Sequence, residues 1–480
     1  MNLLISIGGM TYVYNEFMRI LFAVWELAPF LKVGGLGDVA HFLPKEIKNQ
    51  EEDIRVVTPF YKALRTGRQK RVKVDSFVVW YGGRNVKIDV YQIKFLDADV
   101  PVYLLRNRKY LDVPGKDTFA VFGLSVARLV QYGVEGWKPE IVHGNDHHCG
   151  LLALVLRAWK VPVKFLLTIH SMMEQGKRGK NLIAKMNLEE RWFHLVGWEL
   201  KDRRINSLLE GIKWADVVNT VSPTYAREIR SEEYGAGLDD ILRQEESKIT
   251  GIVNGIDYGE FSPEVDKTLG QNYGVDNWEE GKYRNKLHFQ RKWNLRVNSS
   301  IPMIGFGGRL ASKQKGVDLL HKMMLRMNLS KFQFVIVGQG EEEWEEKFGL
   351  LGDFYPKSVY FAGKFSDEVE RQMYAACDVV LCPSRYEPCG LTQMKGMRYG
   401  CLPVARATGG LIDTIEDGVD GFLFEKLLSV DMEGGLKRAL QIRKDRPEEW
   451  GRMVRTAMKK DFSWKRSAQK YLEVYQRILR

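Results

Sequence analysis

The stretches RILFAVW at residues 19–25 and KVGGLGDVA at residues 32–40 decide the fold class of this chain. The first is a continuous apolar run, which is typical of a strand buried on both faces of a parallel sheet. The second places Gly34 and Gly35 directly before a helix-like segment. A strand that leads through a glycine turn into a helix directs backbone N–H groups and the positive end of the helix dipole toward an anion. We therefore expect an α/β protein with an anion-binding turn, to which Lys32 adds a full charge.

The spacing of these glycines does not identify the anion. It matches neither G-x-G-x-x-G, which binds dinucleotides, nor G-x-x-x-x-G-K-[ST], which binds nucleoside triphosphates. A glycine-rich turn with a solvated lysine fits the same residues, so the carrier of a phosphate has to be sought elsewhere in the chain.

Apolar runs bounded by turn residues alternate with helix-like stretches along the whole chain, as in doubly wound α/β domains. The expected strands are 19–25, 54–60, 100–105, 141–145, 164–170, 216–222, 302–308, 332–338, 358–363, 378–384 and 402–405. In the first half, the expected helices are 37–48, 119–133, 148–159, 184–196 and 203–214. In the second half, helix spacing is present at KGVDLLHKMMLRM, SDEVERQMYAAC, GLTQMKGMRYG and the final segment WKRSAQKYLEVYQRIL.

Two domains follow from this alternation and from the length of 480 residues. We expect an N-terminal Rossmann-like domain over 18–260, a C-terminal one over 261–457, and a terminal helix within 458–480 that packs back on the first domain. Ligands of open α/β sheets bind beyond the carboxyl ends of the strands, which favours a site in a cleft at the domain boundary. Residues 1–17 lack the features of a signal or transit peptide, and we interpret them as an extension or a start-site artefact.

Composition limits the function classes. The net charge of +11 suits an anionic substrate, but the basic residues are dispersed and the patch GRQKRVK lacks interleaved aromatic residues, so nucleic acid is not an expected partner. The longest apolar stretch is interrupted by Arg157, Lys160 and Lys164, so no membrane span is expected. Five cysteines without C-x-x-C spacing indicate a reducing compartment, for which we expect the cytoplasm, with a plastid as the alternative.

Seven motifs occur in the order found in bacterial glycogen synthases and plant starch synthases, and from residue 19 to the final helix the chain resembles that family. The motifs are KVGGLGDV, HGNDHHCG (143–150), TIHSMMEQG (168–176), VNGID (253–257), GGRLASKQKGVDLL (307–320), SRYEPCGLTQMKGMRYGCLPV (384–404) and TGGLIDTIEDG (408–418).

The resemblance implies a GT-B fold, in which two Rossmann-like domains face each other across a deep cleft. It also implies transfer of glucose from ADP-glucose or UDP-glucose to the non-reducing end of an α-1,4-glucan, with retention at the anomeric carbon and without a metal or other cofactor. The sequence distinguishes neither the two donors nor the oligomeric state.

Arg309 and Lys315 are the expected phosphate-binding cations, because both follow the strand PMIGFGG in a short polar loop. When the bond between the anomeric carbon and the diphosphate breaks, negative charge grows on the leaving phosphate and must meet preorganised cations. The alternative is a pair of ordinary surface cations.

A carboxylate and a helix start occur together in SRYEPCGLTQ. Glu387 is expected to bind glucose hydroxyls or, alternatively, only to stabilise the helix N-terminus. The N–H groups of Cys389, Gly390, Leu391 and Thr392 are expected to meet the sugar or its phosphate. Cys389 is also explained as a small apolar filler. From the first domain, the resemblance adds Lys32, Gly34, Gly35 and Asp38 to the substrate-binding residues.

The resemblance assigns four further positions. His170 is expected beside the transferred sugar, although a histidine at a strand end is often structural. Asp146 is the second expected sugar-side carboxylate. Phe365 is expected against the nucleotide base or, alternatively, in the core, and Asn254 is expected at the donor or as part of the domain hinge.

Histidines surround Asp146 at positions 143, 147 and 148, and this cluster raises the question of zinc. No further matched ligand lies at a suitable spacing, so no metal is expected.

Several positions depart from the family pattern. Ser171 and Glu174 stand where asparagine and tyrosine are usual, His147 stands where tryptophan is common, and the loop from Arg309 to Lys315 is one residue longer. Lys395 replaces the second glutamate of many GT-B enzymes, as is usual in the glycogen and starch synthase branch. No carboxylate nucleophile is apparent in the sequence. This favours a reaction in which the diphosphate departs from one face of the anomeric carbon and the acceptor attacks the same face. The altered loop at Ser171 and Glu174 is compatible with an alternative function, that of a catalytically weak protein that binds glucan or nucleotide. The fold is also compatible with a transferase that uses another sugar acceptor.

Overall fold

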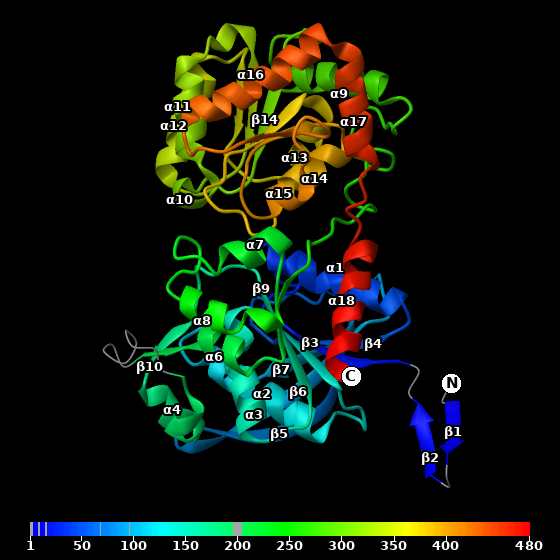
Figure 1. Ribbon diagram of the computed structural model, residues 1–480, viewed down its shortest axis with the longest axis vertical. Helices are drawn as coiled ribbons and strands as arrows, with labels where there is room; N and C mark the ends of the chain where they lie inside the picture. The colour runs from blue at the N-terminus through cyan, green and yellow to red at the C-terminus, as the bar shows by residue number, and fades with distance from the viewer. Residues whose placement is uncertain (1–2, 8–9, 15–16, 68, 96, 195–203) are drawn as a thin grey trace. The chain divides into compact units, whose positions relative to one another are not determined.

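The computed structural model divides into two compact units, coloured along the chain in Figure 1. It describes every residue except 1–2, 8–9, 15–16, 68, 96 and 195–203. The first unit comprises Met1–Val221, Ala226–Ile252 and Trp464–Arg480, and the second comprises Ser222–Tyr225 and Val253–Ser463. Among the described residues, no helix combines the length and the apolar character that crossing a bilayer requires.

The first unit is built on a sheet whose strand order, over the described residues, is β13-β12-β9-β8-β3-β4-β7-β6-β5. The strands are β3 (Arg19–Ala23), β4 (Asp53–Pro59), β5 (Val72–Tyr81), β6 (Arg84–Lys94), β7 (Pro101–Arg106), β8 (Ile141–Asn145), β9 (Lys164–Ile169), β12 (Val217–Thr220) and β13 (Ile249–Gly251). Apart from β5 and β6, neighbouring strands pair in parallel. Outside this sheet, β1 (Leu3–Ile7) pairs with β2 (Met10–Tyr14), and β10 (Lys177–Gly179) pairs with β11 (Arg204–Asn206).

The hairpin of β5 and β6 is absent from the sequence-based expectation. Both strands run antiparallel to their neighbours at the edge of the sheet, and Gly82 and Gly83 take positive φ in the turn between them. Because one face of this hairpin is exposed, buried and exposed residues alternate along β5. Such strands do not appear as continuous apolar runs. The pattern that predicts them is the alternation of apolar and polar residues on both sides of the Gly82–Gly83 pair.

Helices cover both faces of the first sheet (Figure 1). α1 and α18 pack together, and α3 packs against both α2 and α6. The helices of this part of the chain are α1 (Gly35–Asn49), α2 (Thr118–Tyr132), α3 (Gly150–Ala158), α4 (Asn181–Met186), α6 (Ser207–Trp214), α7 (Pro223–Glu228), α8 (Asp239–Gln244) and α18 (Trp464–Leu479).

The helix expected over 184–196 is wrong in its extent. α4 ends at Met186, because Asn187 adopts a left-handed backbone conformation. The last two positions of the expected helix, 195 and 196, lie outside the described residues. The helix expected from 203 begins at Ser207, where the side chain of Asn206 accepts a hydrogen bond from the N–H of Leu209.

The C-terminal helix α18 contributes its apolar face to the core of the first unit. Trp464, Ala468, Tyr471 and Tyr475 are buried there with residues of β3, β4 and α1. The hydroxyl of Tyr475 lies 2.7 Å from Nδ1 of His143 on β8, and the amide of Asn219 on β12 donates to the hydroxyl of Tyr471. The final segment of the chain is therefore an integral part of this unit.

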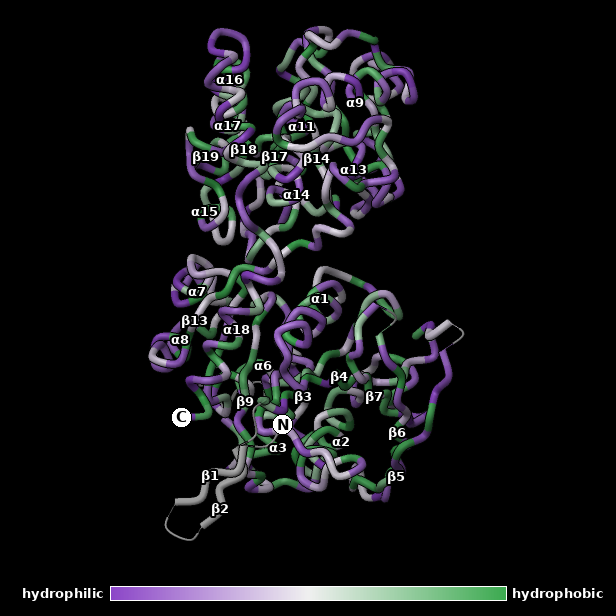
Figure 2. Tube along the Cα trace, turned by 90° about the vertical axis from the view of Figure 1, so that its right-hand side faces the viewer, coloured by the Kyte–Doolittle hydropathy of each residue, from purple (hydrophilic) through white to green (hydrophobic). Residues whose placement is uncertain are grey.

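The second unit contains a parallel sheet with the strand order β16-β15-β14-β17-β18-β19. Figure 2 shows hydrophobic residues along its strands. The strands are β14 (Met303–Gly307), β15 (Gln333–Val337), β16 (Val359–Ala362), β17 (Val379–Cys382), β18 (Leu402–Arg406) and β19 (Phe422–Phe424). The helices are α9 (Trp278–Lys292), α10 (Ser312–Lys315), α11 (Val317–Arg326), α12 (Glu342–Phe354), α13 (Asp367–Ala376), α14 (Thr392–Arg398), α15 (Gly410–Thr414), α16 (Ser429–Asp445) and α17 (Pro447–Lys459).

Each sheet has one topological switch point. In the first unit, the chain proceeds from β3 to one side through β4 and β7, and then to the other side through β8, β9 and β12. In the second unit, it proceeds from β14 through β15 and β16, and then through β17, β18 and β19. In doubly wound folds, ligands bind beyond the carboxyl ends of the strands at such points. The segments that follow β3 and β8, and those that follow β14 and β17, are therefore the places to seek a site.

Candidate functional site

The loop after β3 is organised by Glu26, a carboxylate that the sequence analysis did not single out. Only 3% of its surface is exposed, and its Oε2 accepts hydrogen bonds from the N–H groups of Val33 and Gly34 at 2.6 and 3.0 Å. Burial raises the pKa of Glu26. The N–H of Gly34, expected to meet a phosphate, thus already has an acceptor within the protein.

Gly34 and Gly35 stand at the start of α1. Gly34 precedes the first helical residue in an extended conformation, and Gly35 opens the helix. Lys32 forms an ion pair with Asp38 in the first turn, with 2.8 Å between Nζ and Oδ2. The structure thus brings together all four expected residues of this motif and adds Glu26 to them.

On the other side of this switch point, Asp146 follows β8 with φ of 55°. Its Oδ1 accepts a hydrogen bond of 2.7 Å from the N–H of His170, at the end of β9. The ring Nε2 of His170 lies 2.9 Å from Oδ1 of Asn145. Asp146 and His170 are therefore held together by neighbouring parallel strands, as the motif positions predict.

Burial acts on both of these groups. Burial, together with the charges of Glu174 and Glu26, raises the pKa of Asp146 to about 7, although hydrogen bonds from the N–H groups of His170 and Ser171 act in the opposite direction. Burial also lowers the pKa of His170 to about 3, so its imidazole is neutral at physiological pH.

In the second unit, Lys315 and Glu387 come from the two sides of the switch point. Nζ of Lys315, at the end of α10, lies 2.5 Å from Oε2 of Glu387, and the hydroxyl of Ser384 donates to the same oxygen. Only 6% of Glu387 is exposed. Because the carboxylate accepts these bonds with a single oxygen, its position is fixed while lone pairs remain for a further donor.

Glycine is required between α10 and α11. Gly316 has φ of 64°, and a Cβ on it would lie 2.1 Å from the carbonyl oxygen of Pro383, directly after β17. This close approach of two loops brings Lys315 to Glu387. The guanidinium of Arg385 donates to the carbonyl of Ser312 and pairs with Asp318, which ties the same two loops together.

Arg309 lies in the loop after β14 and is exposed, with its guanidinium donating to Oε1 of Gln314 at 2.6 Å. Arg309 and Lys315 therefore lie on one short connection, and both side chains are held by polar partners.

The expected donors from Cys389 to Thr392 do not all belong to a helix. α14 begins at Thr392, and Gly390 has φ of 75°, so Cys389 and Gly390 precede the first turn. The amide of Gln393 donates to the carbonyls of Cys389 and Gly390. A Cβ on Gly410 would lie 2.2 Å from the Cys389 carbonyl oxygen, so the TGG motif packs directly on this turn.

The buried environment of Cys389 fits its interpretation as an apolar filler. Only 5% of its surface is exposed, and burial raises the pKa of its thiol to about 12. The backbone N–H of Asn254 hydrogen-bonds its sulfur, which places Asn254 beside this turn.

Phe365 follows β16 and is 39% exposed. This exposure contradicts the alternative of a core residue and leaves part of the side chain accessible to a ligand. Its backbone N–H donates to the side chain of Gln339, which follows the neighbouring strand β15.

Comparison with known proteins gives two matching family models. Residues 19–244 match the starch synthase catalytic domain, and residues 301–441 match the group 1 glycosyl transferases.

Curated relatives can be aligned with this chain along nearly their entire length. The chain is 35% identical to the glycogen synthase of Mycoplasma mobile over 475 residues, covering 95% of this chain and 99% of the relative. It is 36% identical to the glycogen synthase of Clostridioides difficile over 483 residues, covering 96% and 100%.

Among solved structures, the catalytic domain of starch synthase IV from Arabidopsis thaliana, bound to ADP and acarbose, is similar with a TM-score of 0.86. It is 28% identical, and the alignment covers 97% of this chain and all of that one. Sucrose-phosphate synthase from Thermosynechococcus elongatus aligns with a TM-score of 0.62 at 18% identity, over 96% of this chain and 99% of that one, which is a likeness of fold. These likenesses confirm the expected GT-B class with its two Rossmann-like units.

Proposed function

The chain belongs to the glycogen synthase family of glucan-elongating glucosyltransferases, and from this premise we propose that it uses ADP-glucose to extend an α-1,4-glucan. The ADP in the starch synthase IV structure supports an adenine nucleotide as the donor, and the acarbose in the same structure supports an oligosaccharide acceptor. The free, buried cysteines support a reducing compartment, for which we propose the cytoplasm.

The pair of Lys315 and Glu387 carries this proposal, because it places a cation and a fixed carboxylate together at the switch point of the second unit. The donor diphosphate brings more than one negative charge, and we assign its binding to Lys315 and Arg309. Glu387 accepts hydrogen bonds from hydroxyl groups of the glucose. The exposed ring of Phe365 stacks on the nucleotide base.

In the first unit, the residues after β8 and β9 hold the sugar. Asp146, in its ionised form, accepts hydrogen bonds from glucose hydroxyls, and the backbone and neutral ring of His170 line the position of the anomeric carbon. Glu26 fixes the turn at Gly34, and Lys32 contributes positive charge on the phosphate side.

The reaction breaks the bond between the anomeric carbon and the oxygen of the β-phosphate, and it forms a bond from the same carbon to O4 of the terminal glucose. Negative charge develops on the departing phosphate oxygen, where Arg309 and Lys315 stabilise it in a preorganised site. The proton of the attacking hydroxyl passes to that phosphate oxygen. Attack on the face from which the phosphate departs retains the configuration without a protein nucleophile.

Release of nucleoside diphosphate tests the donor and the acceptor together. The protein is incubated with ADP-glucose or with UDP-glucose, each with glycogen, with maltose and without an acceptor. We expect release that depends on glycogen and is faster with ADP-glucose. Faster release from UDP-glucose would overturn the choice of donor, and retained glycogen binding without any release would favour a non-catalytic glucan-binding protein.

A further inference from the structure

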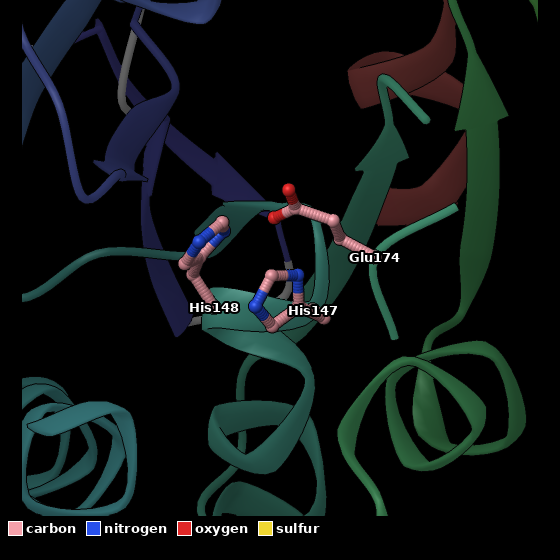
Figure 3. Close-up of side chains that lie close together, drawn as sticks. All are labelled: His147, His148 and Glu174. Carbon is pink, nitrogen blue, oxygen red and sulfur yellow. The ribbon is translucent and has the colours of Figure 1, made fainter. Parts of the chain in front are cut away.

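Two histidines and a glutamate converge at the carboxyl edge of the first sheet, as Figure 3 shows. His147 and His148 form the short turn after β8, and Glu174 lies in the loop after the neighbouring strand β9. One potential ligand atom from each of the three residues lies within 4.8 Å of the other two. In sequence, Glu174 is far from both histidines, so only the pairing of β8 with β9 brings it to them.

Both imidazole rings hold a buried nitrogen that has no hydrogen-bond partner in the described part of the chain. Each histidine residue is 7% exposed, and in each case the atom without a partner is Nδ1. A buried polar atom without a partner costs roughly 1–3 kcal/mol, so its presence calls for an explanation. A bound metal ion supplies one for such lone pairs.

Packing holds the two rings in place. The rings of His147 and His148 lie 3.7 Å apart between centroids, and His148 stacks on Trp25 at 4.8 Å. Phe119 contacts both histidines edge-on. A Cβ on Gly176 would lie 2.5 Å from the ring of His147, so the loop that carries Glu174 lies directly against it.

The charges around the cluster permit a cation. Glu174 contributes a carboxylate, and its charge acts on the carboxyl group of Asp146, which directly precedes His147. A positive charge near both histidines is that of Arg178, whose guanidinium donates to the backbone carbonyls of Lys116 and Lys177.

We propose that His147, His148 and Glu174 form a binding site for a divalent transition-metal ion, with zinc as its expected occupant. Two imidazoles and one carboxylate are the nitrogen and oxygen ligands that zinc accepts, and three protein ligands leave a coordination position for water. The metal joins the turn after β8 to the loop after β9. No step of the glucosyl transfer proposed above uses this metal.

The test is titration of the chelator-treated, dialysed full chain with zinc chloride in a calorimeter. Cobalt(II) absorption spectra of the same samples report the ligand field. We expect one tight site and a higher Tm with zinc. Glu174→Gln and His148→Phe should each weaken binding more than about tenfold, the cost of losing even an outer partner of a metal ligand. Glu174 is exposed, so its substitution leaves folding intact.

Two matched variants serve as controls. Glu189→Gln removes an exposed carboxylate, and His321→Phe removes a histidine of the second unit; both should bind zinc as the wild type does. Absence of a tight site in the wild type would overturn the proposal. Equal affinity in Glu174→Gln or in His148→Phe would also overturn it, because that residue would then not be a ligand.

Discussion

Nζ of Lys315 lies 2.5 Å from Oε2 of Glu387, although 72 positions separate the two residues in the chain. The contact forms because Lys315 ends the helical turn after β14, while Glu387 follows β17, the strand beside it. A doubly wound sheet places these two strand ends together at its switch point. The pair therefore follows from the topology of the second unit.

Replacement of Lys315 by alanine is expected to lower kcat about a hundredfold or more. The variant lacks a preorganised cation at the leaving phosphate, and loss of one such group typically has an effect of this size. Steady-state release of nucleoside diphosphate measures it. Lys313→Ala is the matched control, because Lys313 is an exposed lysine of the same helix. Equal turnover in the Lys315 and Lys313 variants would remove Lys315 from the leaving-group role.

Replacement of Gly316 by alanine is expected to reduce both stability and turnover. The new Cβ meets the Pro383 carbonyl at 2.1 Å in a left-handed conformation, which costs roughly 1–3 kcal/mol or more and separates the two loops. Thermal unfolding and kcat are the measurements. Gly434→Ala is the control, because that helical glycine has open space around it. An unchanged Tm in the Gly316 variant would contradict the described packing.

Phe365→Ala is expected to raise KM for the nucleotide sugar about two- to tenfold, the equivalent of one aromatic contact, without lowering Tm. The reason is that the ring is exposed and contributes little to the core. Phe354, which is 75% exposed on α12, provides a control substitution. If both variants had the same KM as the wild type, the assignment of Phe365 to the base would fail.

The stability of the first unit is expected to fall as the pH drops below about 6.5. Burial holds the pKa of His143 well below its usual value, and both ring nitrogens bond to hydroxyls, of Tyr475 and Thr168. Below this pH, His143 binds a proton in the unfolded chain but not in the folded chain, and this difference favours unfolding. In His143→Gln, the decrease of Tm between pH 7 and pH 5 should be smaller than in the wild type. A decrease of the same size would exclude this coupling.

Much of the fold could be predicted from the sequence, because buried parallel strands appear as continuous apolar runs. The runs at 19–25 and 141–145 became the neighbouring strands β3 and β8. The hairpin of β5 and β6 was not predicted by this criterion, because its outer face is exposed. The end of α4 was not predicted either, because it depends on the backbone conformation of a single residue, Asn187.

The candidate site was predictable only where a residue lies within a motif. Glu26 lies between the first apolar run and the glycine turn, and its role depends on N–H groups that turn back toward it. The third member of the histidine cluster, Glu174, depends on the pairing of two strands. Contacts of this kind arise from tertiary structure, so sequence spacing alone does not reveal them.

The most direct test of the central claim is proton NMR of the wild-type protein with ADP-glucose and a short maltooligosaccharide. The account predicts that the α-anomeric signal of the donor is replaced by that of new α-1,4 linkages, with ADP released in equal amount. Appearance of β-linked product, or of free glucose without a longer oligosaccharide, would contradict it.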